Sequence, residues 1–143
     1  MEEKKSAHES EVGGELGPWE YEVTNETVRR MTEVLEEPDL WYREDSPFGG
    51  PVAPATITAD DYIRVLETRF EHRGAVHIRA EHEFINLVRP GKRYTVRGKV
   101  ADRYEKKRRD YVIIESVTTD EDGMDIVRSR NILLLSLKVR TEQ

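Results

Sequence analysis

The residues best placed to do chemistry lie in one long loop and at the start of the helix that follows it. Residues 38–54 hold a run of helix- and strand-breaking positions, at Pro38, Pro47, Gly49, Gly50, Pro51 and Pro54. A loop of this length is uncommon inside a compact domain, and where one occurs it is often functional. The chain then enters a predicted helix at Ala55, and the N–H groups at a helix N-terminus suit anions and polarised carbonyl oxygens. We interpret the loop as site-forming, with a packed lid as the alternative.

The four histidines are the obvious candidates for proton transfer at neutral pH. His77 and His82 are an odd number of residues apart on one predicted strand, so we expect them on opposite faces and unable to share a metal ion. His82 is in register with the apolar face and indicates a core or interface histidine. His8 falls in a predicted tail and His72 in a predicted loop. We therefore expect no metal site, and the absence of cysteine removes thiolate and disulfide chemistry.

Three charged segments could bind ions or anionic partners, but ordinary structural roles explain them at least as well. The acidic residues of the loop, Glu36, Glu37, Asp39, Glu44 and Asp45, favour a solvated loop over a divalent-cation site. The segment 120–123 lacks the closing Glu of a calcium loop and indicates a hairpin turn. The basic run 106–109 fits either an anionic partner or a charged turn that protects strand edges. The sequence holds no nucleophilic triad, P-loop or dinucleotide fingerprint.

The amino-acid composition limits the number of domains and argues against several classes of protein. The 143 residues suit one domain, and a charged share equal to the hydrophobic share, 36% each, leaves apolar residues for one core. The net charge of −6 argues against nucleic acid as a partner. No apolar run reaches the ~18–20 residues that a membrane span needs, and the N-terminus has no apolar signal core, so we expect a cytoplasmic protein. Residues 1–17 predict a mobile tail, and residues 18–143 a single domain.

The pattern of apolar positions predicts an α+β domain. We expect a short strand near residues 20–23, a first helix capped by Asn25 and ended by Pro38, and a longer helix over residues 55–70. Four strands follow, over residues 76–84, 94–104, 111–117 and 126–139, joined by short turns as in an antiparallel sheet. The last strand is apolar on both faces over residues 132–135. We therefore expect the helix to cover one face and a partner subunit the other.

Three segments together resemble the MaoC-like dehydratase and hydratase family, and more closely its N-terminal-type half-domains. They are Ser46-Pro-Phe-Gly-Gly-Pro-Val-Ala-Pro-Ala55, Val88-Arg-Pro-Gly91 and Arg97-Gly-Lys-Val100. The resemblance covers roughly residues 20–135. It implies a hot-dog fold, with an antiparallel sheet wrapped around one long central helix. It also implies that two such domains pair, as a homodimer or a heterodimer, and bind a thioester of coenzyme A or acyl carrier protein, with no other cofactor.

The resemblance also assigns the site. In the family, a D-x-N-P-x-H loop transfers protons, and a backbone N–H in the segment F-G-x-x-(I/V)-A-x-G holds the thioester oxygen. The second segment implies thioester-binding positions at Gly49, Gly50, Ala53 and Ala55. In the first, Glu37 stands in place of Asp and Tyr42 in place of His, with Asp39 between them, so these three are the candidate catalytic residues. A tyrosine with an ordinary pKa near 10 is a poor base at neutral pH.

The leading hypothesis is therefore an acyl-thioester-binding subunit of a 2-enoyl-thioester hydratase or 3-hydroxyacyl dehydratase. A separate chain that carries the Asp/His pair would then supply the proton transfer. Two alternatives stay open at this point. One is a hot-dog acyl-CoA thioesterase that uses a carboxylate such as Glu37 or Asp39, and the other is a non-catalytic acyl-thioester-binding subunit. One scaffold can host all three functions, so the fold does not choose among them.

Overall fold

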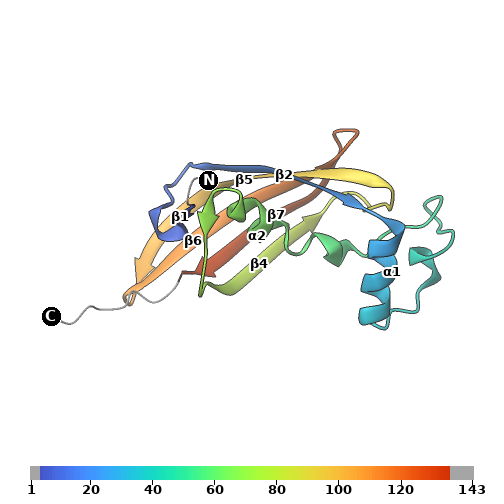
Figure 1. Cartoon of the computed structure of the whole chain (residues 1–143), viewed down its shortest axis with the longest axis horizontal. Coiled ribbons are helices and arrows are strands. Elements are labelled where there is room, and N and C mark those ends of the chain that lie inside the picture. The colour runs from blue at the N-terminus through green and yellow to red at the C-terminus, as the bar shows by residue number, and fades with distance from the viewer. Residues whose placement is uncertain (1–3, 136–143) are drawn as a thin grey trace.

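A computed structural model of the chain describes residues 4–135, and its central feature is a five-stranded antiparallel sheet (Figure 1). The strands lie in the order β2-β5-β6-β7-β4. Their bounds are β2 Glu15–Val23, β4 Val76–Phe84, β5 Lys92–Lys106, β6 Arg109–Asp120 and β7 Asp125–Leu134. The prediction of an antiparallel sheet built from the second half of the chain is confirmed, and β2 completes one edge. Of the last predicted strand, residues 136–139 lie outside the described residues.

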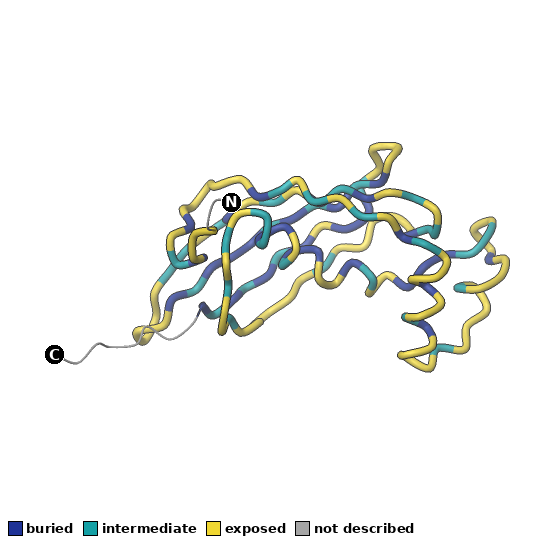
Figure 2. Tube along the Cα trace, in the orientation of Figure 1, coloured by how far each residue is buried: buried dark blue, intermediate teal, exposed yellow. Residues whose placement is uncertain are grey.

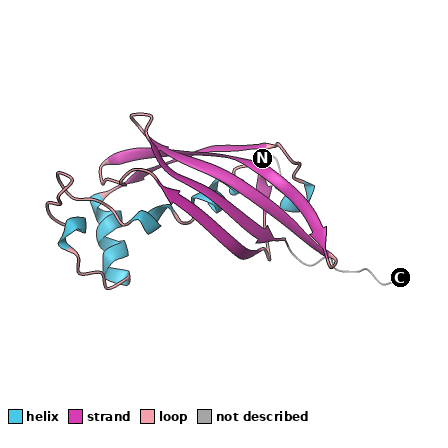
Figure 3. Ribbon diagram, turned by 180° about the vertical axis from the view of Figure 1, so that it is seen from behind, coloured by secondary structure: helices cyan, strands magenta, loops and turns pink. Residues whose placement is uncertain are grey.

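The inner face of the sheet is packed against the helix α2, Asp61–Glu67. Val65 and Leu66 of this helix are fully buried, and they contact alternate residues of the central strands, as the two-residue period of a strand requires. The shared core cluster consists of Ala7, Leu16, Tyr62, Val65, Leu66, Val96, Val100, Val112, Ile114, Leu133 and Leu135. No helix of the described residues crosses the opposite face, which is seen from behind in Figure 3.

The single long helix predicted over residues 55–70 is wrong in its continuity. A 3-10 helix η3, Ala55–Thr58, comes first, and α2 begins separately after Asp60. The Thr58 hydroxyl donates to the Ala55 carbonyl oxygen at 2.8 Å and closes η3 locally. At the other end, the Thr68 hydroxyl donates to the Val65 carbonyl oxygen at 2.6 Å, where α2 ends. Side-chain hydroxyls that bond to the backbone in this way compete with helix continuation.

The predicted mobile tail is also wrong for residues 4–17. This segment forms the short strand β1, Lys5–Ser6, the 3-10 helix η1, Ala7–Glu9, and the first residues of β2. β1 pairs in parallel with the two-residue strand β3, Phe70–Glu71. The Arg103 guanidinium donates to the carbonyl oxygens of Ala7 and Ser10 at 3.2 and 2.6 Å, which fastens η1 to the sheet.

A helical arm projects from one end of the sheet (Figure 1). It consists of α1, Asn25–Val34, and a loop that contains the 3-10 helix η2, Leu40–Tyr42. The N-cap of α1 is Thr24, one residue before the predicted Asn25, because the Thr24 hydroxyl accepts from the Thr27 N–H at 3.0 Å. Several apolar side chains of the arm are exposed, among them Val34 at 82% and Phe48 at 51%.

Strand β4 is the exposed edge of the sheet, opposite β2 (Figure 2). Its partner β7 is half-buried at Ile132 and Leu134 on the outer face, so that face is less covered than the apolar run predicts. A bulge at Ile78 shifts the register, because His77 pairs with Leu133 whereas Arg79 pairs with Ile132. None of the described helices is long and apolar enough to cross a membrane.

The same bulge overturns the prediction that His77 and His82 lie on opposite faces. His77 pairs with Leu133 and His82 pairs with Ser129, and both partners are buried on the inner face of β7. The ring of His77 makes a tilted contact with the ring of Tyr62 of α2, with centroids 4.7 Å apart, which confirms its inward direction. One extra residue between the two histidines restores them to a single face.

Candidate functional site

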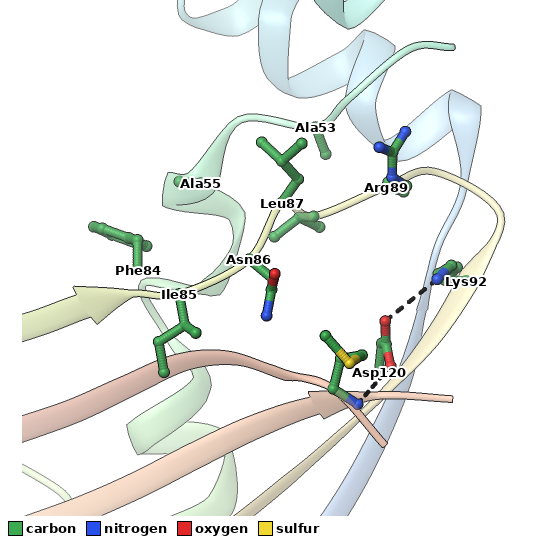
Figure 4. A pocket seen from close by; sticks show the side chains of 11 residues that line it. Ala53, Ala55, Phe84, Ile85, Asn86, Leu87, Arg89, Lys92 and Asp120 are labelled. Carbon is green, nitrogen blue, oxygen red and sulfur yellow. Dashed lines mark hydrogen bonds and ion pairs between the residues drawn. The ribbon is translucent and has the colours of Figure 1, made fainter. Parts of the chain in front are cut away.

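A cavity of about 430 Å³ opens where the 46–55 loop meets the chain segment that follows β4 (Figure 4). One wall comes from Ala53 and from Ala55 at the start of η3, and the other from residues 84–89. The full lining, here called the groove, is Ala53, Ala55, Phe84, Ile85, Asn86, Leu87, Val88, Arg89, Lys92, Asp120 and Met124. Most of these side chains are apolar, and the charged ones, Arg89, Lys92 and Asp120, lie toward one end (Figure 4).

Backbone pairing sets the width of the groove. The Ala53 N–H donates to the Val88 carbonyl oxygen at 2.7 Å, which ties the two walls together. On the second wall, the N–H groups of Ile85 and Asn86 both donate to the Ile126 carbonyl oxygen, at 2.8 and 3.3 Å. These bonds carry the chain out of β4 and across the end of β7. The groove therefore lies directly beside the exposed edge of the sheet.

Only one of the four predicted thioester donors remains available. The N–H groups of Gly49 and Gly50 close turns within their own loop, donating to a carbonyl and a carboxylate oxygen at 3.1 and 2.6 Å. The Ala53 N–H is taken by Val88, as described above. Among the described residues, the Ala55 N–H has no hydrogen-bond acceptor, and Ala55 is exposed and lines the groove. An N–H in this position can donate to an oxygen atom of a ligand.

The three predicted catalytic residues lie together, but outside the groove lining. Burial raises the pKa of the Tyr42 phenol, and the nearby carboxylates of Glu37 and Asp39 raise it further. Both carboxylates bond to the backbone of the arm: Glu37 accepts from the Asp39 N–H at 3.0 Å, and Asp39 caps η2 through the Trp41 N–H, also at 3.0 Å. The raised pKa makes Tyr42 a still poorer base than an ordinary tyrosine.

The polar end of the groove holds two cations in different environments. The Lys92 ammonium donates to Asp120 at 3.3 Å and to Asp122 at 2.9 Å, and these bonds raise the pKa of the lysine. The Asp120 carboxylate also accepts from the N–H groups of Asp122 and Met124, so its pKa stays below the usual range despite burial. The Arg89 guanidinium instead donates to two carbonyl oxygens of the neighbouring loop.

Sequence reasoning missed the second wall of the groove. The run Phe84-Ile-Asn-Leu-Val88 is apolar beyond the predicted end of its strand, and this continued apolar character was the available signal. The side chains of Phe84, Ile85 and Leu87 are 53%, 38% and 37% exposed, although the chain around them is ordered by backbone bonds. Within residues 4–135, no group of three His, Asp or Glu side chains could hold a metal ion.

The architecture is that of a hot-dog domain, a sheet that curves over a central helical segment. No family model matches the chain, and no curated protein matches it. Among solved structures, it is similar to a MaoC-like dehydratase from Rhodospirillum rubrum, with a TM-score of 0.77 and 21% identity over 93% of this chain and 97% of the other. It is also similar to the (R)-hydratase from A. caviae involved in PHA biosynthesis, with a TM-score of 0.77 and 14% identity over 91% of this chain and 100% of the other.

A third similar structure is the C-terminally truncated HadBC complex, a 3R-hydroxyacyl-ACP dehydratase from Mycobacterium tuberculosis. Its TM-score is 0.69, with 18% identity over 86% of this chain and 96% of the other. Identities this low show the fold alone. At that level, the predicted hot-dog fold and the resemblance to MaoC-like dehydratases and hydratases are confirmed.

Proposed function

We propose that the chain is an acyl-thioester-binding subunit of a 2-enoyl-thioester hydratase or 3-hydroxyacyl dehydratase, and that a partner hot-dog chain supplies the acid and base. The thioester handle would be coenzyme A or acyl carrier protein. The cytoplasmic location stays a prediction within this proposal.

The observation that carries the proposal is the combination of an unpaired donor with a groove lining that holds no histidine and only one carboxylate, which is ion-paired. Ala55, whose N–H has no acceptor among the described residues, lines an apolar cavity of a size suited to an acyl group, with cations at one end for an anionic handle. Asp120 is the one carboxylate of that lining, and it is held ionised by Lys92 and two N–H groups. A group so stabilised as an anion is a weak general base and no general acid.

The exposed edge strand supports a partner chain. All nine residues of β4 except His82 are exposed, and Ile78 and Phe84 are about half exposed as large apolar side chains. An unprotected edge of this length offers a row of backbone groups for pairing with another strand. HadBC, to which the fold is similar, is itself a complex. Pairing at β4 would place the partner beside the groove, where it could contribute catalytic side chains.

A non-catalytic acyl-thioester-binding subunit is the second candidate. It is favoured by the same observation, that the groove lining holds no histidine and only one, ion-paired, carboxylate. A thioesterase that acts through Glu37 or Asp39 is less well supported, because neither carboxylate lines the groove and both bond to the backbone of the arm.

The test uses crotonyl-CoA with the purified chain alone. Calorimetry measures binding, and the loss of enoyl-thioester absorbance measures hydration. We expect binding without hydration, and hydration once a partner chain with an Asp/His pair is added. Hydration by the chain alone would contradict the assignment of catalysis to a partner. Release of free thiol would instead support the thioesterase. A chain that remains monomeric and binds no acyl thioester would refute the proposal.

A matched pair of variants isolates the donor. Ala55→Pro removes the N–H and keeps the backbone, because Pro54 already has the extended conformation, φ −57° and ψ 132°, that a following proline requires. Ala55→Gly keeps the N–H. Loss of one hydrogen bond to a polarised oxygen weakens binding by roughly 1–2 kcal/mol, about fivefold to thirtyfold. We expect this loss for Ala55→Pro and a much smaller change for Ala55→Gly.

A further inference from the structure

We propose that Arg89 is the positioning residue of the groove, because it holds the 45–50 loop against the wall that carries Val88. The guanidinium Nη1 donates to the Gly49 carbonyl oxygen at 2.6 Å, and Nη2 donates to the Phe48 carbonyl oxygen at 2.7 Å. Two short bonds from one planar cation to consecutive carbonyls fix both the place and the orientation of that peptide.

The loop has little else to hold it in place. Gly49 and Gly50 have φ values of +79° and +78°, and an added Cβ at either position would meet nothing within 4 Å. Phe48 is 51% exposed and makes a T-shaped contact with Trp41, itself 42% exposed. The bonds from Asp45 and Ser46 close the loop on itself without joining it to the sheet. A segment in which only Ser46 is buried opens readily unless an anchor prevents it.

Arg89 is itself held by the core, and this gives the anchor its rigidity. The fully buried Tyr94 accepts from the Arg89 N–H at 2.8 Å and donates to the Arg89 carbonyl oxygen at 3.1 Å. Burial raises the pKa of this phenol, so it remains a donor at all physiological pH values. The chain of contacts therefore runs from the core through Tyr94 and Arg89 to the loop that precedes Ala53.

The consequence for ligand binding rests on the proposed function, whereas the anchoring does not. Arg89 lines the groove, as seen in Figure 4, and the loop that it holds leads into the wall formed by Ala53 and Ala55. Release of the loop would loosen that wall and reduce the preorganisation of the Ala55 N–H.

The anchoring is tested by trypsin cleavage after Arg43 and by the fluorescence of Trp41 in a Trp19→Phe background, where Trp41 is the sole tryptophan. Arg89→Met keeps the length of the side chain and removes its donors. The loss of the two charge-assisted bonds, both of which are exposed to solvent, should raise the open population of the loop about tenfold or more. We expect cleavage to accelerate by the same factor and Trp41 emission to shift to longer wavelength. Arg89→Lys, with one point donor, should restore part of the protection.

Arg93→Ala is the matched control, because the exposed Arg93 guanidinium pairs only with Glu20 at 3.7 Å among the described ion pairs. It should leave both readouts unchanged. If Arg89→Met does not fold, Tyr94→Phe removes the hydroxyl that orients Arg89 and should accelerate cleavage after Arg43. Wild-type cleavage and emission in a folded Arg89→Met would overturn the anchoring. Faster cleavage with unchanged crotonyl-CoA affinity would confirm the anchoring and count against the groove as the thioester site.

Discussion

The buried carboxylate of Asp61 should lower the free energy of unfolding at neutral pH, and its replacement by Asn should restore that free energy in part. Asp61 is 4% exposed at the start of α2. One oxygen, Oδ2, accepts from the Thr118 hydroxyl at 2.7 Å and from the Tyr21 hydroxyl at 3.0 Å. Burial raises the pKa of Asp61 from its ordinary 3.8 to about 6, although the two hydrogen bonds oppose that rise. The same burial, together with the neighbouring carboxylate, raises the pKa of Tyr21 and keeps it a donor.

The size of the effect follows from linkage. The folded chain holds the Asp61 proton up to about pH 6, whereas the unfolded chain loses it near pH 3.8. Because the folded state binds more protons in that window, the free energy of unfolding falls as pH rises through it, and the loss is complete above the folded value. One pKa unit is worth about 1.4 kcal/mol, so the ionised carboxylate costs about 3 kcal/mol at pH 7.5. The amide of Asn can accept from both hydroxyls, but its N–H₂ group needs an acceptor, which lowers the expected gain to about 1–2 kcal/mol.

The assay is urea unfolding of the wild type and Asp61→Asn at pH 7.5 and pH 4, at one protein concentration in case the chain associates. Asp61→Asn should be more stable than the wild type at pH 7.5, and this advantage should shrink or reverse at pH 4. Glu22→Gln is the control: Glu22 is exposed and does not contribute to the raised pKa of Asp61, so its substitution should change stability equally little at both pH values. An advantage that does not depend on pH would refute the reasoning, as would a variant that is less stable at pH 7.5.

Three further substitutions, with Gly13→Ala as a control for the first, test packing, a buried ion pair and the edge strand. Gly17→Ala should lower the free energy of unfolding by roughly 2–4 kcal/mol in urea, since φ is +88° and the new Cβ would lie 2.8 Å from a side chain of α2. Gly13→Ala, with φ +85° but open space, should cost only about 1 kcal/mol. Asp110→Asn should lower the free energy of unfolding by roughly 2–4 kcal/mol in the same measurement, because it removes the counter-ion of Arg103, which lies 2.7 Å from the Asp110 carboxylate. An unchanged unfolding midpoint would show that the ion pair contributes nothing to stability. Phe84→Glu, at a side chain 53% exposed on β4, should weaken self-association or partner binding in sedimentation without changing the circular dichroism spectrum.

The sheet could be predicted from the sequence because strand signals are local. Alternation over β5 and continuous apolar runs in β6 and β7 mark these strands, and their bounds follow within a few residues. The N-terminal segment could not be predicted in the same way. Its order depends on bonds from Arg103 to Ala7 and Ser10, across sequence separations of 96 and 93 residues. A polar segment without periodicity carries no local sign of such an anchor.

The candidate site shows the same division. The Pro/Gly loop does lead into a groove, as its composition and its position before a helix predict. Which of its N–H groups remain available is decided by acceptors elsewhere, such as the carbonyl oxygen of Val88, 35 residues beyond Ala53 in the chain numbering. A sequence motif can therefore identify the segment that approaches a ligand, but the tertiary hydrogen bonds select the donor within it.

The two histidines of the edge strand β4 are a second case in which tertiary structure overrides the sequence pattern. Counting residues places them on opposite faces, and the count fails because Ile78 is bulged. Their inward direction puts both imidazoles on the inner face of the sheet, next to the edge where a second strand could pair. His82 bonds to the Ser129 hydroxyl at 2.7 Å, and burial together with His77 lowers its pKa, so it stays neutral at pH 7. A neutral imidazole can be covered by a partner at little cost, whereas a charged one cannot. The bulge thus leaves β4 with an inner face that is fit for burial and an outer row of Arg79, Glu81 and Glu83 that remains in water.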